Sequence, residues 1–467
     1  MSAHAENEIE PMTQRSSTRD TDTIGAHDER AWLLYRGIKN LLRCDEAEVV
    51  TGIARYVMSQ HASLRRGAAL MTRTRETPLP SVVALLGGVT RLLEVRADER
   101  RDGAVWVARL SNERRAIEPL LALLPELGWT ELKFRRRPDV VSLAALARSL
   151  GSARRILKLA RRLHRRHEFF KVLRVIELIG YYARYLDLFQ RGRFRLAVMS
   201  SHSNPHGIAF NLAARKCGVP VVLITHGMPV RPVARLSYDL AVVHCEAARQ
   251  TYLNEGCRIE RGLIHGRRQH HAPMPTGPLP EHLRVGIFLC KDVNEQRLRA
   301  VVERLLADAR VARILVRPHP KNLWLGLDEW TLTRNDPRLR RNSGGSVYRD
   351  LEETDIVLAG NSSVLVDAVA RGRPAAYVPG LDYGSLDLHQ FVARGLIYPI
   401  DEELSFDPDA LLRFYQRPDW PDVLRLFANV DEDEASVAAQ AAAAMRELAL
   451  AQGTGAMASA RRCARQD

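Results

Sequence analysis

The sequence predicts an α/β protein with two parallel-sheet domains that face a central cleft, and with helical additions at the N-terminus. Two observations carry this prediction. Short apolar runs alternate with amphipathic helical segments, which is the pattern of β-α-β units. The alternation stops at 265–280, a stretch with four prolines and no periodicity, and then restarts. A chain of 467 residues with 46% hydrophobic content also suits more than one domain.

The N-terminal alternation is clearest after residue 100. Strands and helices follow each other there, and three of the strands end in polar loops that contain His202, His226 and His244. The expected strands are Gly103–Leu110, Trp129–Phe134, Leu196–Met199, Val219–Thr225 and Leu240–Val243. The expected helices are Asn112–Leu127, Ile208–Lys216 and a segment that ends at Asn254. We expect Glu255-Gly256 to form the C-cap of this last helix.

The C-terminal alternation has the same form. Its expected strands are Arg284–Leu289, Ile314–Val316, Asp355–Ala359 and Ala375–Val378, and its expected helices are Asn294–Ala309, Ser346–Glu352 and Ser363–Arg371. Both halves therefore predict a Rossmann-like domain. We expect a disordered tail over 1–28, an N-terminal Rossmann-like domain with a helical, basic insertion over 29–265, a linker over 266–282, a C-terminal Rossmann-like domain over 283–432, and a helix with a tail over 433–467.

The charge and the cysteines limit the function classes. The net charge of +14 and the pI of about 9.8 indicate an acidic partner such as an anionic lipid or a phosphorylated substrate. Six scattered cysteines without a CxxC pair are typical of reduced thiols in a cytoplasmic protein. No apolar run approaches the roughly 18–20 residues of a membrane span, and the N-terminus lacks the apolar core of a signal peptide.

The most basic part of the chain is 144–174, and its arginines concentrate in 154–174. Apolar residues there share one helical face and arginines cover the rest. Three interpretations stay open, in decreasing order of weight: a solvated helix packed by one stripe, contact with an anionic membrane surface or acidic polymer, and nucleic acid. Since the chain matches no nucleic-acid module and has few aromatic residues, we expect no nucleic-acid partner. We expect the protein to be cytoplasmic, with a peripheral position at the inner membrane.

Two polar loops follow strands of the C-terminal half. One is Arg317-Pro318-His319-Pro320-Lys321, and the other is Gly360-Asn361-Ser362-Ser363, directly before a helix. Loops after the carboxyl ends of parallel strands form the ligand crevice of such sheets. Cationic side chains together with hydroxyls and backbone N–H groups at a helix N-terminus suit a phosphate. Each loop also has a structural interpretation, as a turn and as a helix N-cap.

These motifs resemble those of a known group of enzymes. His319-Pro320 and Ser362-Ser363, together with His226-Gly227 at the end of an N-terminal strand, resemble the motifs of GT-B glycosyltransferases that build bacterial capsules and surface polysaccharides. That group includes sialyl- and polysialyltransferases, Kdo transferases and CDP-glycerol glycerophosphotransferases. The resemblance covers roughly 196–379. It implies a GT-B fold, in which 29–265 is the acceptor domain and 283–432 is the nucleotide-donor domain. It also implies a role for His319, Ser362 and Ser363 in binding the cytidine nucleotide of the donor.

Other residues are candidates by position. Arg317, Pro320, Lys321, Gly360 and Asn361 lie in the same two loops, and the resemblance places Asp367 where many GT-B enzymes grip a ribose, although a salt bridge on the helix face is an equal alternative. The resemblance also leads us to look for an acidic general base, and no convincing counterpart of that motif is present. We therefore expect the base to be His202, His206 or His226, because a histidine can deprotonate a hydroxyl near neutral pH.

The resulting hypothesis is an inverting, metal-independent transferase. It would move a sugar or polyol phosphate from a nucleotide-activated donor, with CMP- or CDP-linked donors favoured, to a surface polysaccharide or lipid-linked acceptor. We expect no cofactor. The Asp-x-Asp motifs at 20–22, 407–409 and 431–433 fall in the tail, at a helix N-cap and on a surface helix. Two alternatives remain: an enzyme like UDP-N-acetylglucosamine 2-epimerase, and a non-catalytic GT-B scaffold in capsule assembly.

Overall fold

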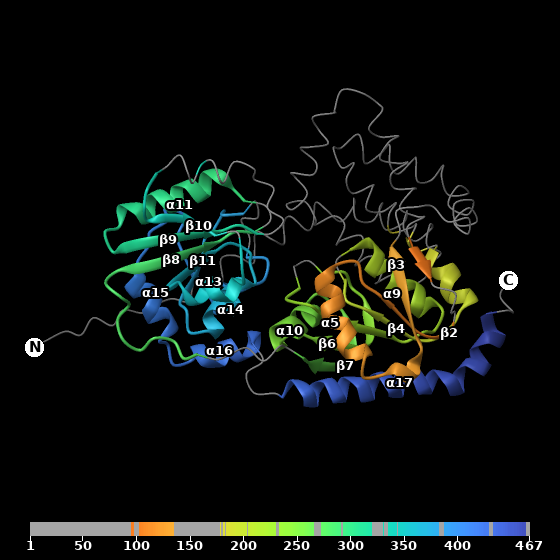
Figure 1. Ribbon diagram of the computed structural model, residues 1–467. Coiled ribbons are helices and arrows are strands. Elements are labelled where there is room, and N and C mark those ends of the chain that lie inside the picture. The colour runs from red at the N-terminus through yellow and green to blue at the C-terminus, as the bar shows by residue number, and fades with distance from the viewer. Residues whose placement is uncertain are drawn as a thin grey trace, which may run out of the picture.

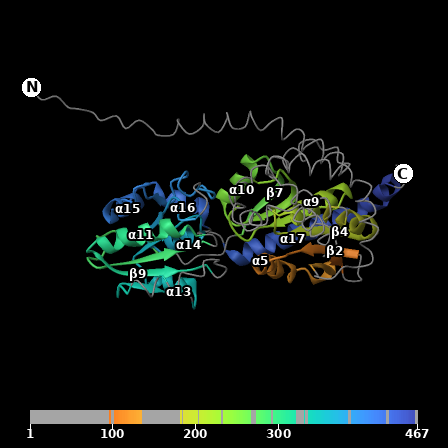
Figure 2. The same cartoon turned by 90° about the horizontal axis from the view of Figure 1, so that it is seen from above.

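The structure is a computed structural model that describes most of the chain from residue 95 onwards. The described residues are 95–97, 102–134, 178, 181–182, 184–202, 204–229, 233–265, 272–290, 293–319, 330, 335–342, 344–382, 387–428 and 433–463. The expectations for the tail over 1–28 and for the basic segment 154–174 lie outside these ranges. The two predicted domains lie side by side (Figures 1 and 2).

The N-terminal domain contains a seven-stranded sheet with the order β1-β3-β2-β4-β5-β6-β7. Six of its strands are parallel, and β1 pairs with β3 in the antiparallel sense. The strands are β1 (Val95–Ala97), β2 (Asp102–Val107), β3 (Trp129–Phe134), β4 (Arg193–Met199), β5 (Val221–Ile224), β6 (Ser237–Val243) and β7 (Arg258–Ile264).

Helices cover both faces of this sheet, which explains why its strands are continuous apolar runs. Alternate residues of each strand point to opposite faces. Val105, Met199 and Leu223 pack on one side with α9 (Pro205–Lys216) and α10 (Glu246–Asn254). Trp106, Val198 and Ile224 belong to a separate core on the other side. That second core is closed by α5 (Ser111–Leu121) and α17 (Glu434–Cys463).

The C-terminal domain contains a six-stranded sheet with the order β10-β9-β8-β11-β12-β13, and all of its strand pairs are parallel. The strands are β8 (Leu283–Phe288), β9 (Val311–Arg317), β10 (Leu339–Arg341), β11 (Ile356–Ala359), β12 (Ala375–Tyr377) and β13 (Tyr398–Pro399), and the helices are α11 (Glu295–Ala307), α13 (Val347–Glu352), α14 (Val364–Ala370), α15 (Pro408–Tyr415) and α16 (Trp420–Phe427). The predicted class, two Rossmann-like domains with parallel sheets, is confirmed.

The structure adds elements that the apolar pattern did not predict. β7, β10 and β13 are edge or near-edge strands with few buried residues, so they lack a continuous apolar run. β2 ends at Val107 rather than Leu110, because Arg109 and Leu110 are exposed and lead into α5. The predicted cap after α10 is confirmed, since Gly256 has a φ of 87° and the Cys257 N–H donates to the Tyr252 carbonyl.

The last helix belongs to the first domain. α17 follows the C-terminal domain in sequence, yet it runs along the N-terminal domain in Figure 1 and packs against β4, β6, β7 and α5. Small residues make this close approach possible: Ala441 and Ala444 are at most 1% exposed in the core between the helix and the sheet. The expected Ala-rich helix is therefore present, and its alanines face a sheet more than 170 residues earlier. Asp433 was expected on a surface helix, but it lies directly before α17. Its carboxylate accepts the Ser436 N–H at 3.0 Å.

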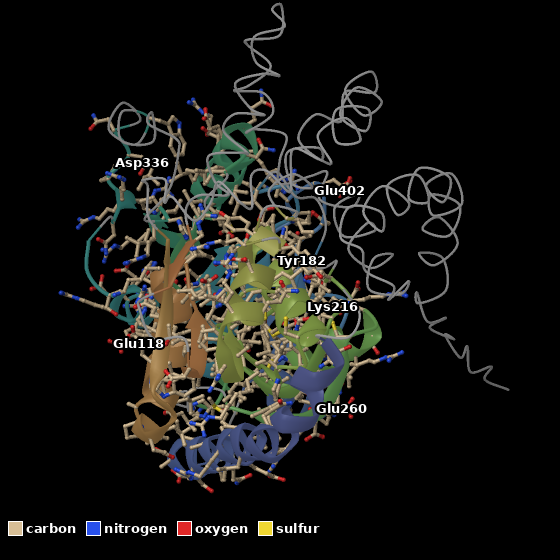
Figure 3. The ribbon with its side chains drawn as sticks, turned by 90° about the vertical axis from the view of Figure 1, so that its right-hand side faces the viewer. Glu118, Tyr182, Lys216, Glu260, Asp336 and Glu402 are labelled. Atoms are coloured by element: carbon tan, nitrogen blue, oxygen red, sulfur yellow. The ribbon has the colours of Figure 1, made fainter. Side chains whose placement is uncertain are left out.

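Charged side chains surround the N-terminal domain. In Figure 3 the exposed residues Glu118, Lys216 and Glu260 lie at its outside, away from the enclosed strands. Within the described ranges, no helix has both the length and the apolar character that crossing a membrane requires.

Candidate active site

The strand ends of the N-terminal sheet bring His226 and Ser200 together. β4 and β5 are parallel neighbours, and Met199 pairs with Leu223 at their carboxyl ends. The residues that follow therefore leave the sheet side by side. The buried Ser200 Oγ lies 3.0 Å from His226 Nδ1. On the next strand, Thr225 Oγ1 accepts the His244 N–H at 2.9 Å, so the loop that carries His226 is held from both sides.

His226 has the properties of a general base. The residue is exposed, and its Nδ1 lies at hydrogen-bond distance from the Ser200 hydroxyl. Partial loss of water around the ring lowers the pKa of His226, while the negative charge of Glu113 opposes this shift. The imidazole is therefore neutral at neutral pH, which is the form that accepts a proton.

Glu113 is a carboxylate of this region that the sequence analysis did not single out. It lies in the first turn of α5 and is only 1% exposed. Its Oε2 accepts the N–H groups of Arg109 and Leu110, at 2.6 and 3.0 Å, directly after β2. Its Oε1 is enclosed and has no hydrogen-bond partner among the residues that the structure describes. Since β2 and β4 flank the point where the strand order reverses, Glu113 lies at the position where open sheets of this kind bind ligands.

The other two candidate bases are enclosed. His202 is 7% exposed, and its Nδ1 lies 2.6 Å from the Tyr252 hydroxyl. Burial, together with the nearby His226, lowers the pKa of His202 to about 3. His206 lies in α9 and is fully buried, with its ring edge-on to Tyr181. Neither imidazole reaches the surface that His226 reaches.

On the C-terminal side, Gly360-Asn361-Ser362-Ser363 joins β11 to α14. Asn361 is the centre of this loop. Its backbone N–H and its Nδ2 donate to the two carboxylate oxygens of Asp382, at 2.6 and 3.0 Å. Gly360 allows the approach, since a Cβ at this position would lie 2.6 Å from Asp382 Oδ2. The Asn361 side chain therefore stabilises the conformation of the loop.

The two serines lie beyond this anchor. Ser363 is exposed and precedes α14, and Ser362 is half-buried, with its hydroxyl 3.4 Å from the Val364 N–H that donates to it. Asp367 is half-buried in the first turn of the same helix, and its backbone carbonyl accepts from Arg371. This part of the loop offers hydroxyls and backbone N–H groups at a helix start.

The His319 loop follows β9, and β8 lies between β9 and β11. With neighbouring strands spaced by about 4.8 Å, the two loops leave the sheet roughly 10 Å apart. His319 is exposed two residues after the strand. Pro320 and Lys321 lie outside the described residues. The strand order of this domain reverses between β8 and β11, so the serine loop lies at a switch point too.

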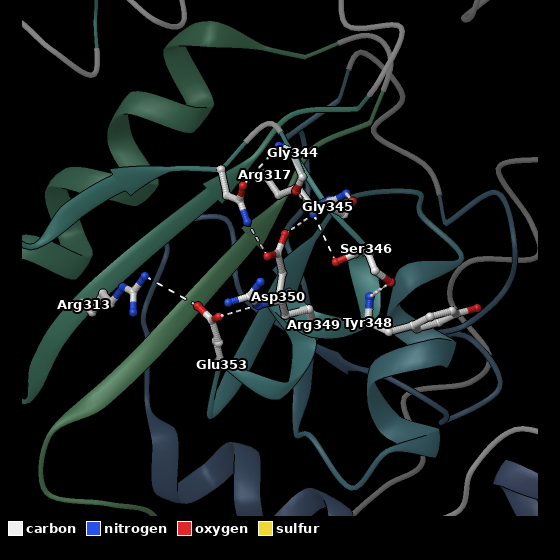
Figure 4. A network of polar contacts seen from close by, with 10 residues as sticks. Arg313, Arg317, Gly344, Gly345, Ser346, Tyr348, Arg349, Asp350 and Glu353 are labelled. Carbon is white, nitrogen blue, oxygen red and sulfur yellow. Dashed lines mark hydrogen bonds and ion pairs between the residues drawn. The ribbon is translucent and has the colours of Figure 1, made fainter.

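Arg317 has a structural environment that the sequence did not reveal (Figure 4). Its guanidinium forms an ion pair with the buried Asp350 and donates to the carbonyls of Gly344, Gly345 and Ser346, at 3.3, 2.9 and 3.4 Å. These contacts tie 344–346 to the end of β9. The guanidinium is therefore directed at the protein itself, beside the loop that carries His319.

A segment after β12 connects the two halves of the site. The Asn361 side-chain oxygen accepts the Leu388 N–H at 2.8 Å. Burial lowers the pKa of the next residue, His389, and the backbone carbonyls of Pro229 and Asn361 oppose this shift. The same segment reaches the N-terminal domain, where Arg394 donates to the Gln250 side-chain oxygen of α10 at 3.2 Å.

The residues that sequence reasoning missed had weak signals. Asp382 and His389 follow a strand, so the rule that ligands bind after strand ends could have included them, but no motif selects them. Glu113 occupies the third position of a helix, where a glutamate is ordinarily read as a cap. Only the register of β2 against β4 places it near His226.

No family model matches this chain, and no curated protein matches it by sequence. Solved structures resemble it in three dimensions. The calicheamicin glycosyltransferase CalG4 is 13% identical, with 74% of this chain and 98% of that chain covered and a TM-score of 0.46. UDP-GlcNAc 2-epimerase from Neisseria meningitidis, bound to UDP-GlcNAc, is 10% identical, with 74% and 99% covered and a TM-score of 0.40. The wall teichoic acid polymerase TagF, soaked with CDPG, is 11% identical, with 88% and 99% covered and a TM-score of 0.37.

These structures include both transferases and an epimerase, and their likeness concerns the arrangement of the chain. That arrangement is visible in the strand orders given above. Each domain contains six parallel strands of Rossmann-like order, and the last helix returns to the first domain.

Proposed function

We propose that this protein is an inverting, metal-independent glycosyltransferase. It transfers a sugar or a polyol phosphate from a nucleotide-activated donor, CMP- or CDP-linked, to a bacterial surface polysaccharide or a lipid-linked acceptor at the membrane. The observation that carries the proposal is one segment that contacts both domains: the Leu388 N–H donates to the Asn361 side-chain oxygen at 2.8 Å, and Arg394 donates to Gln250 of α10 at 3.2 Å. This arrangement supports a reaction between a ligand of one domain and a ligand of the other.

In the acceptor half, His226 is the base. It is exposed, it is neutral at neutral pH, and Ser200 fixes its ring. Its Nε2 takes the proton of an acceptor hydroxyl as the oxygen attacks the donor. His202 and His206 support the loop from inside, because both are enclosed. The reaction is a single displacement: the acceptor oxygen forms its new bond as the bond to the nucleotide phosphate breaks.

In the donor half, the leaving phosphate needs positive charge and hydrogen-bond donors. His319, Ser362, Ser363 and the N–H groups at the start of α14 supply them. Asp367 on the same helix holds the ribose in this proposal. Arg317 acts indirectly in this proposal, because its guanidinium anchors the neighbouring loop through Asp350.

The carboxylates of the donor half favour transfer over epimerisation. An epimerase requires carboxylates that are poised around the sugar. Asp382 already accepts two hydrogen bonds from Asn361, and Asp387 accepts the N–H groups of Phe391, Val392 and Ala393 at 2.9, 2.7 and 2.9 Å. These two side chains hold loops in place, which supports the transferase.

Calorimetric titration with CMP, CDP, UDP and GDP tests the proposal. We expect a cytidine nucleotide to bind the wild type, and His319→Ala and Ser362→Ala to lose binding. His282→Ala is the matched control, because His282 is exposed directly before β8, at the opposite end of the sheet. Preference for UDP would favour ordinary hexose transfer or the epimerase. Absence of binding by all four nucleotides would overturn the proposal and favour a scaffold.

Product analysis is a second test, and it distinguishes transfer from epimerisation. Release of free nucleotide that depends on an added polysaccharide acceptor indicates transfer. Conversion of a nucleotide sugar without an acceptor indicates epimerisation.

A further inference from the structure

The helix α14, which follows the donor loop at 360–363, has one accessible stripe. Six of its seven residues are buried, and Asp367 is the one that keeps exposed surface. Ser363, four residues earlier, and Arg371, four residues later, keep exposed surface too. Residues four apart lie on the same face of a helix, separated by about 6 Å along its axis. The candidate donor residues Ser363 and Asp367 therefore share this face with Arg371.

The Arg371 side chain is held in one orientation. Its Nη1 donates to the Asp367 carbonyl, one turn earlier, at 3.3 Å. Its Cζ lies 4.1 Å from the centroid of the Tyr348 ring, which is the geometry of a cation–π contact. Among the residues that the structure describes, no carboxylate forms an ion pair with Arg371. The guanidinium is thus fixed by a carbonyl and an aromatic ring, and neither neutralises its charge.

Tyr348 lies on a firmly held turn. The Tyr348 N–H donates to the Ser346 hydroxyl at 3.2 Å, and the Arg317 guanidinium donates to the three carbonyls of 344–346. Figure 4 shows the Tyr348 ring directed away from the ion pair of Arg317 with Asp350. Tyr348 is 38% exposed, so the pair of ring and guanidinium lies at the surface. The buried ion pair therefore stabilises the turn that presents this ring.

We propose that Arg371 binds the base of the donor nucleotide and selects cytosine, and that Tyr348 is a positioning residue that holds the plane of the guanidinium. This inference rests on the proposed function, in which Asp367 holds the ribose. A base that is bonded to this ribose lies next to Arg371, because Arg371 follows Asp367 by one helical turn and its Nη1 reaches the Asp367 carbonyl.

The chemistry of a guanidinium favours cytosine over uracil. A guanidinium presents only hydrogen-bond donors, in a planar fork. Cytosine has two adjacent acceptors, O2 and N3, which match two parallel N–H groups. Uracil carries a hydrogen on N3, so one of the two contacts becomes a donor facing a donor, and this repulsion adds to the loss of a hydrogen bond. Because Tyr348 fixes the plane of the guanidinium, rotation of the side chain does not relieve the mismatch.

Calorimetric titration of the full-length protein with CMP and UMP tests the inference, since these two ligands differ only in the base. We expect the wild type to bind CMP about tenfold to hundredfold more tightly than UMP, the factor that a bidentate contact with a base supplies. Arg371→Ala should remove this preference by weakening CMP and should leave the affinity for UMP within about threefold. Arg349→Ala is the matched control. It removes an arginine beside Tyr348 whose side chain is 79% exposed, and it should keep the preference for CMP.

Two variants of Tyr348 test its positioning role. Tyr348→Phe keeps a ring for the cation–π contact and should keep the ratio of the two affinities. Tyr348→Leu removes the ring and should lower this ratio, because the guanidinium plane is no longer held. An unchanged ratio in Tyr348→Leu would overturn the role of Tyr348.

The remaining outcomes separate this inference from the proposed function. An equal loss of CMP and UMP affinity in Arg371→Ala would show that the arginine serves the phosphate, and it would overturn the base contact. Equal affinity of the wild type for CMP and UMP would overturn the selection of cytosine, while the transferase proposal would stand. Absence of binding by both nucleotides would overturn the proposed function together with this inference.

Discussion

Ser200 and His226 lie on neighbouring strand ends, and the Ser200 hydroxyl is 3.0 Å from His226 Nδ1. The serine is fully buried and the histidine is exposed. The buried partner thus fixes the orientation of the exposed ring. Neither residue suggests this contact alone, because 26 positions separate them in the sequence. It follows from the parallel pairing of β4 with β5.

The first prediction concerns the base. His226→Gln should lower the rate of transfer by about 10²–10⁴-fold, the usual contribution of a general base, while nucleotide affinity stays unchanged. Ser200→Ala should cause a smaller loss, because the ring remains but its orientation is no longer held. Steady-state rates and calorimetry on the same preparations check both. Full activity in His226→Gln would show that the base is another residue.

The second prediction concerns pH. The acid limb of the rate profile should follow the pKa of His226, which its surroundings lower, so activity should persist below the ordinary pKa of histidine. The charge of Glu113 raises this pKa. Glu113→Gln removes the charge and keeps an oxygen for the N–H groups of Arg109 and Leu110. The acid limb of the rate profile of this variant should therefore move to lower pH.

Glu118→Gln is the control for this shift. Glu118 lies on the same helix and makes the same change of charge, but its side chain is 54% exposed, where water screens its field. Its pH profile should match the wild type. A shift of equal size in both variants would mean that net charge, rather than the position of Glu113, sets the pKa of His226.

The sequence predicted the fold well because both sheets consist of buried parallel strands. Runs such as Val221–Ile224 and Ile356–Ala359 are apolar throughout, and the loops that follow them include His226 and Ser362. The sequence analysis missed the edge strand β7 because this strand has no buried residue and charged residues interrupt its apolar pattern.

The environment of each candidate residue could not be predicted. Arg317 lies next to His319 in the sequence, and only the structure shows its ion pair with Asp350, 33 positions later. Asn361 lies in a loop whose composition suits phosphate binding. Its side chain nevertheless forms hydrogen bonds with Asp382 and Leu388. Local patterns identify the loops, whereas long-range contacts decide which side chains remain available to a ligand.

The third prediction tests the structural role of Arg317. Its side chain is 14% exposed and that of Asp350 is 2% exposed. Asp350→Ala leaves a buried cation without its partner and should lower the free energy of unfolding by about 3–5 kcal/mol. Asp422→Ala breaks an exposed pair with Arg425 and should cost about 0–1 kcal/mol. Urea unfolding checks both values. Equal stability of the two variants would contradict a structural role for Arg317.

The last prediction concerns Gly360, because the conformation of the donor loop requires a residue without a Cβ at this position. A Cβ at this position would lie 2.6 Å from Asp382 Oδ2 and 3.0 Å from Asp382 Cγ. Gly360→Ala should push Asp382 away from Asn361, lower the free energy of unfolding by about 1–3 kcal/mol and weaken nucleotide binding. Gly277→Ala is the matched control, because a Cβ there meets nothing within 4 Å.

Urea unfolding and calorimetry separate the two effects. If Gly360→Ala binds nucleotide as tightly as Gly277→Ala does, the contact between Asn361 and Asp382 does not shape the donor site. If it loses binding at a temperature where it remains folded, the loop must keep this geometry for the serines to reach a phosphate.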